Sequence, residues 1–278
     1  MEILPFDLAV AAASFFAGLL GALIGLGGGI IVTPLLVLVF GIDIRYAMGA
    51  ALVSVIATSS GAAAAFLRDG ISNMRIAMFL NLATTCGAVA GAFLATVLDT
   101  QILSVVFGVA LLATVLLSLK PAPGNGSAEP DDLARKLRLL GEMPTPAGPV
   151  AYGARKVPAG FAMMIVAGIL SGLLGIGSGA FKVLAMDRIM RIPFKVSTTT
   201  SNFMIGVTAA ASVGVYLKRG YLDPALAGPV SLGVLAGAFV GAKLLPVAPV
   251  KVLRGIFLVV VTLIGIQMVA RGFGFNLG

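Results

Sequence analysis

The sequence has no histidine, no tryptophan and only one cysteine, Cys86. A single cysteine excludes a disulfide within the chain, and in an apolar run such as 81-NLATTCGAVAGAF-93 we expect it to be a small packing residue. No cluster of side chains has the composition of a metal site, and no nucleophile stands beside a base. The sequence therefore predicts neither an enzyme nor a bound metal or cofactor.

Charge of either sign is also scarce, at 11% of residues, whereas 59% are hydrophobic and the mean hydropathy is +1.09. A soluble domain has about one quarter charged residues, so this composition indicates an integral membrane protein. The apolar runs have roughly the 20 residues that a helix needs to cross a hydrocarbon core of about 30 Å. They lack the alternation of barrel strands, so the predicted fold class is an all-α membrane protein, and the lipid bilayer is its first partner.

Ten transmembrane or partly re-entrant helices are predicted, at residues 6–24, 29–41, 44–67, 76–98, 101–119, 157–175, 179–190, 194–217, 224–245 and 250–271. Residues 120–156 between the fifth and sixth are rich in proline, glycine and charge, which is typical of a linker. Within this linker, 131-DDLARKLRLL-140 is expected to form a short surface helix. The chain is thus divided into a first transmembrane repeat at 1–119, a cytoplasmic linker at 120–156 and a second repeat at 157–278.

The two halves align on each other without a gap and at a constant offset. The alignment pairs Gly25, Gly27 and Gly29 with Gly175, Gly177 and Gly179, and the boundary charges Arg45 and Arg68 with Lys195 and Lys218. We interpret this as an internal repeat. Because five segments per half is an odd number, the second half would enter the membrane in the opposite direction, which predicts two inverted five-helix repeats.

The distribution of basic residues predicts the orientation. Fourteen lysines and arginines fall on the side of the linker, and four fall on the other side. By the positive-inside rule the linker is cytoplasmic and both termini lie outside, in a bacterial cytoplasmic (inner) membrane. The same rule accounts for the surplus of basic residues, so nucleic acid is not an expected partner.

Two glycine-rich interruptions, 25-GLGGG-29 and 175-GIGSG-179, are called the glycine breaks below. The second lies eleven residues from Arg188, or about 16 Å of helix, which places it near the middle of the bilayer. Irregular backbone at that depth is tolerated only where it is buried or lines a cavity. Facing breaks would offer N–H groups and helix N-termini to an anion, so the expected binding residues are Gly27, Gly28, Gly29, Gly177, Ser178 and Gly179. Gly18, Gly21 and Gly25, with Gly168, Gly172 and Gly175, are instead spaced for close helix packing.

Lys182 follows the second break by one helical turn and is a candidate for the counter-charge of the anion, because a cation inside the bilayer is costly. The alternative is that Lys182 snorkels to the interface or pairs with Asp187. The run from Ser197 to Asn202 contains six hydroxyl or amide side chains in an otherwise apolar segment. Its members Ser197, Thr198, Ser201 and Asn202 are predicted polar ligands, and Thr198, Ser201 and Asn202 share one helical face.

The doubled break and the stretch 197-STTTSNFMIGVTAA-210 resemble the sulfite exporter TauE/SafE family over nearly the whole chain. The resemblance implies an anion transporter for sulfite, organosulfonates or thiosulfate, with some members assigned to other small organic anions. This chain has 49-GAALVS-54 where many relatives carry Gly-Thr-Ser-Leu, and Ser178 where glycine is common. We therefore expect a polar lining concentrated in the second half.

The predicted function is transport of a small sulfur-containing anion across the inner membrane by alternating access. An anion channel shares every feature above, and so does a carrier of a non-sulfur organic anion. A membrane scaffold would have no use for irregular backbone at mid-depth.

Overall fold

The computed structural model describes residues 3–24, 29–68, 72–119, 130–144, 148–244 and 250–275. The first half contains α1 (Ile3–Ile24), α2 (Gly29–Leu38), α3 (Ile44–Arg68), α4 (Met74–Val97) and α5 (Thr100–Leu119). The linker contains α6 (Asp132–Lys136), β1 (Leu140–Met143) and β2 (Val150–Gly153). The second half contains α7 (Val157–Leu174), α8 (Gly179–Leu184), the π-helix η1 (Ala185–Ile189), α9 (Phe194–Lys218), α10 (Pro224–Leu244) and α11 (Val250–Gly272).

The long helices have the length and composition of membrane spans. Among the described residues, α4, α5, α7, α9 and α10 contain apolar windows long enough to cross a bilayer, and α1, α2, α3 and α11 contain shorter ones. Large apolar side chains cover the outside of the body, such as Leu8 at 73% exposure and Leu232 at 70%. Such a surface suits lipid rather than water, so the prediction of a helical membrane protein is confirmed. Cys86 lies on this surface and is exposed, so its prediction as a packing residue was wrong.

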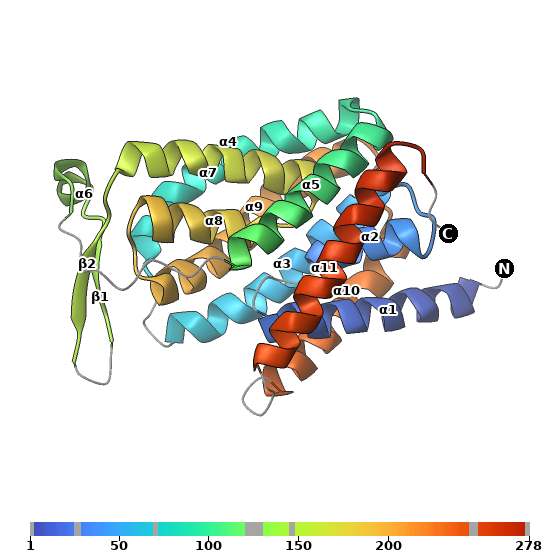
Figure 1. Cartoon of the computed structure of the whole chain (residues 1–278), viewed down its shortest axis with the longest axis horizontal. Coiled ribbons are helices and arrows are strands. Elements are labelled where there is room, and N and C mark those ends of the chain that lie inside the picture. The colour runs from blue at the N-terminus through green and yellow to red at the C-terminus, as the bar shows by residue number, and fades with distance from the viewer. Residues whose placement is uncertain are drawn as a thin grey trace.

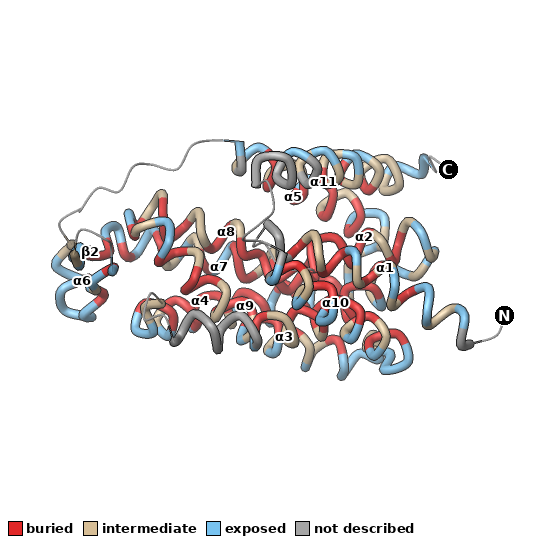
Figure 2. The backbone as a smooth tube through the Cα atoms, turned by 90° about the horizontal axis from the view of Figure 1, so that it is seen from below, coloured by how far each residue is buried: buried red, intermediate tan, exposed pale blue. Residues whose placement is uncertain are grey.

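The helices form an elongated body whose centre is the most buried part (Figures 1 and 2). Helix α1 packs along α10, α4 packs along α7, and α3 lies against both α9 and α10. Helices α5 and α11 run side by side on one face of the body (Figure 2). The linker elements lie at one end of the long axis, and the start of α1 and the end of α11 lie toward the other end (Figure 1).

Glycines allow the long helices to touch backbone to backbone. A Cβ atom added at Gly18 of α1 would overlap the Val234 carbonyl of α10, and one at Gly168 of α7 would overlap the Thr84 carbonyl of α4. Gly172 is packed in the same way against Ala88. In lipid, where apolar side chains gain little by meeting one another, such close approach is a main source of helix association. The predicted packing role is confirmed for Gly18, Gly168 and Gly172.

The same contact recurs further along these two helix pairs. Gly237 of α10 rests on the Phe15 carbonyl of α1, and Gly87 of α4 rests on the Ile165 carbonyl of α7. Each pair is therefore joined at successive glycines rather than at one crossing point.

The described part of the linker contains more regular structure than its composition predicted. Its helix ends at Lys136, before the predicted end, and the strand β1 begins at Leu140. Strands β1 and β2 form an antiparallel hairpin in which Leu140 pairs with Gly153 and Met143 with Val150. The sequence pattern did not predict this hairpin, because such short strands carry too few positions to show an alternation.

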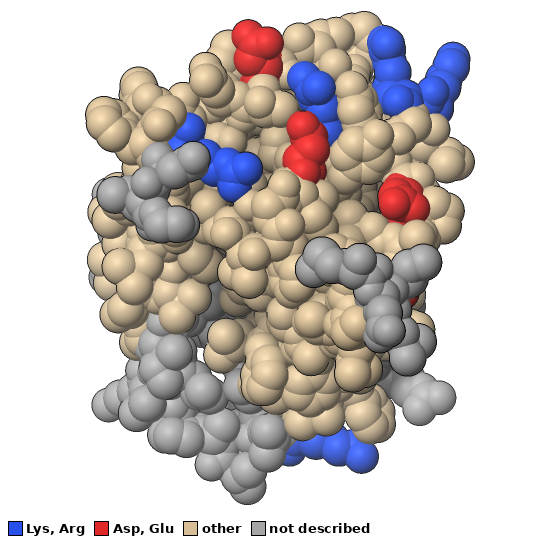
Figure 3. Space-filling view, turned by 90° about the vertical axis from the view of Figure 1, so that its right-hand side faces the viewer, with Lys and Arg blue, Asp and Glu red and all other residues tan. Residues whose placement is uncertain are grey.

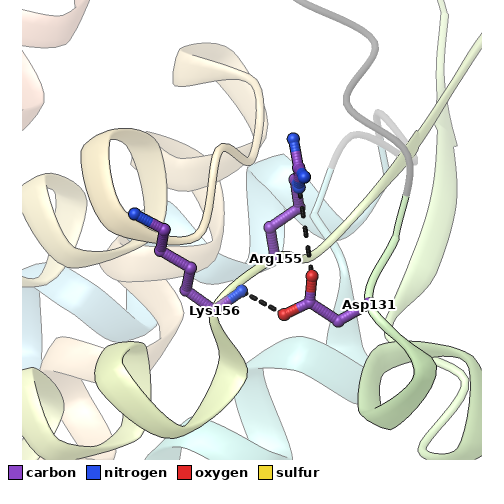
Figure 4. A network of polar contacts seen from close by, with 3 residues as sticks. All are labelled: Asp131, Arg155 and Lys156. Atoms are coloured by element: carbon purple, nitrogen blue, oxygen red, sulfur yellow. Dashed lines mark hydrogen bonds and ion pairs between the residues drawn. The ribbon is translucent and has the colours of Figure 1, made fainter.

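Polar contacts tie the linker to the start of α7 (Figure 4). The Asp131 carboxylate accepts a hydrogen bond from the backbone N–H of Lys156 and lies 3.9 Å from the Arg155 guanidinium. The backbone N–H of Arg155 donates to the Met190 carbonyl, just beyond η1, at 2.9 Å. The linker therefore joins the beginning of α7 to the end of the α8–η1 segment.

Asn73 connects the linker to two further helices. It caps α4, because its Oδ1 atom accepts from the N–H of Ile76 at 3.1 Å. Its Nδ2 atom donates to the Tyr152 hydroxyl at 3.0 Å, and its backbone N–H donates to Thr200 Oγ1 of α9 at 3.1 Å. The linker, α4, α7 and α9 thus meet at one end of the body and share one apolar core there.

Replacing Gly237 with alanine should destabilise the protein, because the added methyl would press on the backbone of α1. We expect a loss of about 1 to 3 kcal/mol, measured as a lower unfolding temperature in detergent. Gly228→Ala is the matched control, since Gly228 lies in the same helix with nothing within 4 Å of its Cβ position. Equal unfolding temperatures for the two variants would contradict close packing of α10 on α1.

Candidate anion-binding site

The second glycine break is a buried, left-handed stretch of backbone between α7 and α8. Helix α7 ends at Gly175 with φ 67°, and Gly177 and Ser178 follow with φ 71° and 43°. Glycine adopts such angles without strain, whereas a residue with a Cβ does so at a cost of about 1 to 2 kcal/mol. Ser178 is held there by its hydroxyl, which donates to the Ala167 carbonyl of α7 at 2.5 Å. The serine thus fixes the break against α7.

Gly29, at the end of the first break and the start of α2, approaches the second break. Gly27 and Gly28 lie outside the described residues, but Gly29 begins α2 and is buried. The Cβ position of Gly29 is 3.4 Å from the Gly175 carbonyl oxygen and 3.7 Å from the Cα atom of Ile176. Corresponding segments of the two halves therefore meet inside the protein.

Apolar side chains enclose this meeting point. Val55 of α3 lies against Gly29 and Gly177, and Ile205 of α9 lies against Gly177 and Gly179. Both Val55 and Ile205 are buried. Any polar group beside the breaks is consequently in a medium where unpaired charge is expensive.

Lys182 is such a group. It is completely buried, at 0% exposure, and its Nζ atom donates to Thr208 Oγ1 at 2.8 Å and to the Met204 carbonyl at 3.5 Å. Both partners belong to α9. The ammonium therefore neither snorkels to a surface nor pairs with Asp187, the two alternatives that the sequence left open.

The direction of the Lys182 side chain brings its charge back toward the break. Side chains on an α-helix lean toward its N-terminus, and Lys182 stands one turn into α8. Its partner Thr208 lies one turn along α9 from Ile205, which touches Gly177 and Gly179. Lys182 and the break therefore contact successive turns of α9.

Both hydrogen-bond partners of Lys182 are neutral. A carboxylate that would balance the ammonium is absent from the hydrogen bonds and ion pairs of Lys182 in the described residues. A buried ion is tolerated when it is both hydrogen-bonded and compensated by opposite charge. The hydrogen bonds are present, and the opposite charge would come from a bound anion.

Polar contacts continue from Lys182 into the first half of the chain. Thr208 Oγ1 lies 3.4 Å from Thr84 Oγ1 of α4, and Thr84 Oγ1 lies 3.4 Å from Asn81 Oδ1. Asn81, Thr84 and Thr208 were not among the predicted site residues, because none of them is charged or belongs to a long polar run. The signal was available: Asn81 is an amide within a segment predicted to cross the membrane.

The hydroxyl-rich run at the start of α9 does not gather in one place. Ser201 is buried, and its hydroxyl donates to the Gly179 carbonyl at 3.3 Å, so it adjoins the break. Ser197 is buried and donates to Ile192, whereas Asn202 is half-buried. Thr198 is also half-buried, and its hydroxyl donates to the Phe194 carbonyl of its own helix. Consecutive helical residues differ by about 100°, so six in a row point all around the helix.

The candidate site therefore consists of Lys182 and Thr208, Ser201 at the break, and the extension through Thr84 to Asn81. It offers hydrogen-bond donors and one positive charge. In the described part of the chain, no group of three or more His, Cys, Asp or Glu residues could hold a metal ion. This chemistry favours a small anion.

A family model described as "Sulfite exporter TauE/SafE" matches residues 10–268. The probable membrane transporter protein YunE of Bacillus subtilis (strain 168) is 27% identical over 264 residues, which cover 92% of this chain and 94% of YunE. The probable membrane transporter protein YdhB of the same organism is 28% identical over 242 residues, covering 86% and 91%. The probable membrane transporter protein ORF9 of Sinorhizobium sp is 25% identical over 261 residues, covering 93% and 90%. No solved structure matches the chain significantly.

Replacing Lys182 with methionine keeps an unbranched side chain, one atom shorter, and removes its charge. We expect the affinity for the transported anion to fall about ten-fold to a hundred-fold, the loss of one charge-assisted hydrogen bond. The unfolding temperature without anion should stay equal or rise, because an uncompensated buried charge is removed. Lys182→Arg should bind the anion with intermediate affinity, because the planar guanidinium group fits poorly in a site shaped for a compact ammonium. Isothermal titration and thermal unfolding of purified protein measure the two effects, and equal dissociation constants for Lys182→Met and wild type would remove Lys182 from the site.

Proposed function

Because the chain belongs to the sulfite exporter TauE/SafE family, we propose that it carries a small sulfur-containing anion of the sulfite, sulfonate or thiosulfate class across the bacterial inner membrane. The observation that carries this proposal is Lys182, a wholly buried ammonium with neutral partners only among the described residues. The relatives YunE and YdhB are named probable membrane transporter proteins, which favours transport over an enzymatic reaction.

The anion would bind between the breaks and α9. Lys182 would supply the counter-charge, and Ser201 a hydroxyl beside the second break. The backbone around Gly29 and from Gly177 to Gly179 would add N–H donors, as the first turn of a helix leaves such groups without intrahelical partners. The remaining candidates, Gly27, Gly28, Ser197, Thr198 and Asn202, are retained as groups that an anion would meet along its path.

We propose that the two halves are inverted repeats that alternate access to this site. The packing supports this, because contacts between the two halves recur at the offset of the sequence alignment with the partners exchanged. Gly18 on Val234 corresponds to Gly168 on Thr84. Gly87 on Ile165 corresponds to Gly237 on Phe15, with the partners exchanged between the halves. A two-fold axis relating 1–119 to 157–278 would produce such an exchange.

The surroundings of the two breaks follow the same offset. Val55 touches Gly29, and Ile205, which the alignment pairs with Val55, touches Gly179. The positive charge of Lys182 has no counterpart in the first half, because the aligned position is Val32, which is buried in α2. The scaffold would thus be symmetric and the anion site asymmetric.

A carrier is favoured over an anion channel by the burial of Lys182. An ammonium at 0% exposure is closed off from both sides in this conformation. An anion would reach it only after helices separate, which is a step of every alternating-access cycle and not of conduction through a fixed pore. A carrier of a non-sulfur organic anion would use the same site. Uptake of sulfur anions and of acetate into liposomes distinguishes these two kinds of carrier.

We further propose that the linker is cytoplasmic and that both termini lie outside. The linker and the termini lie toward opposite ends of the long axis, as this topology requires (Figure 1). The end near the termini, viewed in Figure 3, shows a few acidic and basic side chains over a largely uncharged surface. The described linker alone carries Arg135, Lys136, Arg138, Arg155 and Lys156, in accord with the positive-inside rule.

Reconstituted protein should transport sulfite, thiosulfate, methanesulfonate or taurine and discriminate against acetate. Uptake into liposomes should saturate and should show counterflow, in which unlabelled anion inside accelerates entry of labelled anion. The Lys182→Met variant in matched liposomes is the control for leak. Saturable uptake of acetate with no response to the sulfur anions would support the non-sulfur carrier, and linear flux without counterflow would support the channel.

Single cysteines in a Cys86→Ala background test the topology. Lys136→Cys, exposed in α6, should resist a membrane-impermeant maleimide in intact cells, because the linker is cytoplasmic. Lys218→Cys, exposed at the opposite end of the body, should be labelled under the same conditions. Permeabilised cells serve as the control for reactivity, and labelling of Lys136→Cys alone in intact cells would reverse the orientation.

A further inference from the structure

Asn81 of α4 places an amide group in the apolar interior, with only 6% of the residue exposed. Its Oδ1 atom faces the Thr84 hydroxyl at 3.4 Å, but its Nδ2 atom has no hydrogen-bond partner among the described residues. A buried hydroxyl can turn toward a carbonyl of its own helix, as Thr84 does toward Leu80 and Asn81. The amide nitrogen of Asn81 makes no such contact with a carbonyl of α4 among the described residues. The amide of Asn81 therefore requires an acceptor that α4 does not supply.

The position of Asn81 indicates where that acceptor would be. Asn81 and Thr84 are three residues apart and share one buried face of α4. Thr84 contacts Thr208, and Thr208 accepts a hydrogen bond from Lys182. The unpaired amide and the uncompensated ammonium thus belong to one polar cluster, separated by two hydroxyl groups.

The cluster has open donors at both ends. The Thr208 hydroxyl is engaged with the Met204 carbonyl at 2.7 Å, and the Thr84 hydroxyl with carbonyls of α4. Within the described structure, Lys182 uses two of its three N–H groups, and the Asn81 amide uses neither of its two. A ligand that satisfies these groups has oxygens that only accept hydrogen bonds, and it carries negative charge.

We propose that Asn81 is a second ligand of the anion that Lys182 binds, so that the site is built from both halves of the chain. This inference rests on the proposed function and adds to it a residue from the first half. One oxygen of the anion lies at the Lys182 ammonium and another at the Asn81 amide. Asn81 thereby favours anions that present three acceptor oxygens around one central atom, such as sulfonates and sulfite.

The geometry of the ligand head group follows from this arrangement. A sulfonate presents three oxygens around sulfur, so it can reach donors in different directions at once. A sulfonamide replaces one oxygen by an NH₂ group, which donates and carries no charge at neutral pH. Methanesulfonate should bind, and methanesulfonamide, which has nearly the same size, should not.

The Asn81→Leu variant separates a ligand role from a packing role. The side chain keeps a similar volume and loses both donors. We expect methanesulfonate and sulfite to bind about ten-fold to a hundred-fold more weakly, while the unfolding temperature without anion stays equal or rises because an unpaired polar group is removed. An unfolding temperature that falls, together with unchanged affinity, would assign Asn81 to packing and overturn the proposal.

The Asn81→Asp variant tests the same proposal without changing the shape of the side chain. An aspartate here would supply the missing negative charge within the protein. Its carboxylate would neutralise the Lys182 ammonium across the hydroxyls of Thr84 and Thr208. Methanesulfonate binding should then be lost in folded protein, even though a hydrogen-bonding side chain remains. If Asn81→Asp bound methanesulfonate with wild-type affinity, the proposal would be overturned. This test can still be interpreted if Asn81→Leu fails to fold.

Ser231→Ala is the matched control. Ser231 lies in α10 at the position that the repeat alignment pairs with Asn81, and its hydroxyl is likewise buried without a partner among the described residues. The residue that aligns with Lys182 is Val32, so no charge is expected beside Ser231, and its replacement should leave affinity unchanged.

Titrations of wild type, Lys182→Met, Asn81→Leu and the double variant complete the test. If both residues hold one anion, their effects on affinity are not additive. Loss of binding in Lys182→Met with normal binding in Asn81→Leu would refute only the present inference. Normal binding in Lys182→Met would remove Lys182 from the site, and absence of anion binding and transport in the wild-type protein would refute the proposed function itself.

Discussion

The interaction on which the rest of this structure depends is a buried ammonium that has no acidic partner among the described residues. Lys182 is sealed among apolar helices and hydrogen-bonded to Thr208 and to a backbone carbonyl. Neutral acceptors orient an ammonium but do not neutralise it. Under the proposed function, the affinity of the site for an anion would come from the charge that the protein itself leaves uncompensated.

The scaffold around the lysine is held by close backbone contacts rather than by large side chains. Glycines of α1 and α10, and of α7 and α4, let the paired helices touch at several successive turns. This packing leaves little freedom within each pair, so movement is expected between pairs rather than inside them. Lys182 contacts α9, and its polar cluster continues into α4. Separation of α8 from these helices would open the site.

The linker adds a constraint at one end of this arrangement. Asn73 joins α4, α9 and the hairpin, and Arg155 joins the hairpin to the end of the α8–η1 segment. These contacts connect the helices that surround Lys182 to one another outside the apolar core. The linker therefore forms part of the body that carries the candidate site, and its sequence composition alone suggested a loose connection.

Composition and the spacing of apolar runs determined the membrane class and the order of the helical segments, because about 20 apolar residues in a row have few other uses. The sequence also singled out Lys182 and the glycine breaks, since charge and irregular backbone are rare inside a bilayer. Only the tertiary structure decided what these groups meet. It replaced Asp187 by Thr208 as the partner of Lys182, turned the Thr198 hydroxyl onto its own helix, and brought Asn81 from the first half toward a lysine of the second. Contacts between residues so far apart in the chain depend on how whole helices pack, and no local pattern in the sequence encodes them.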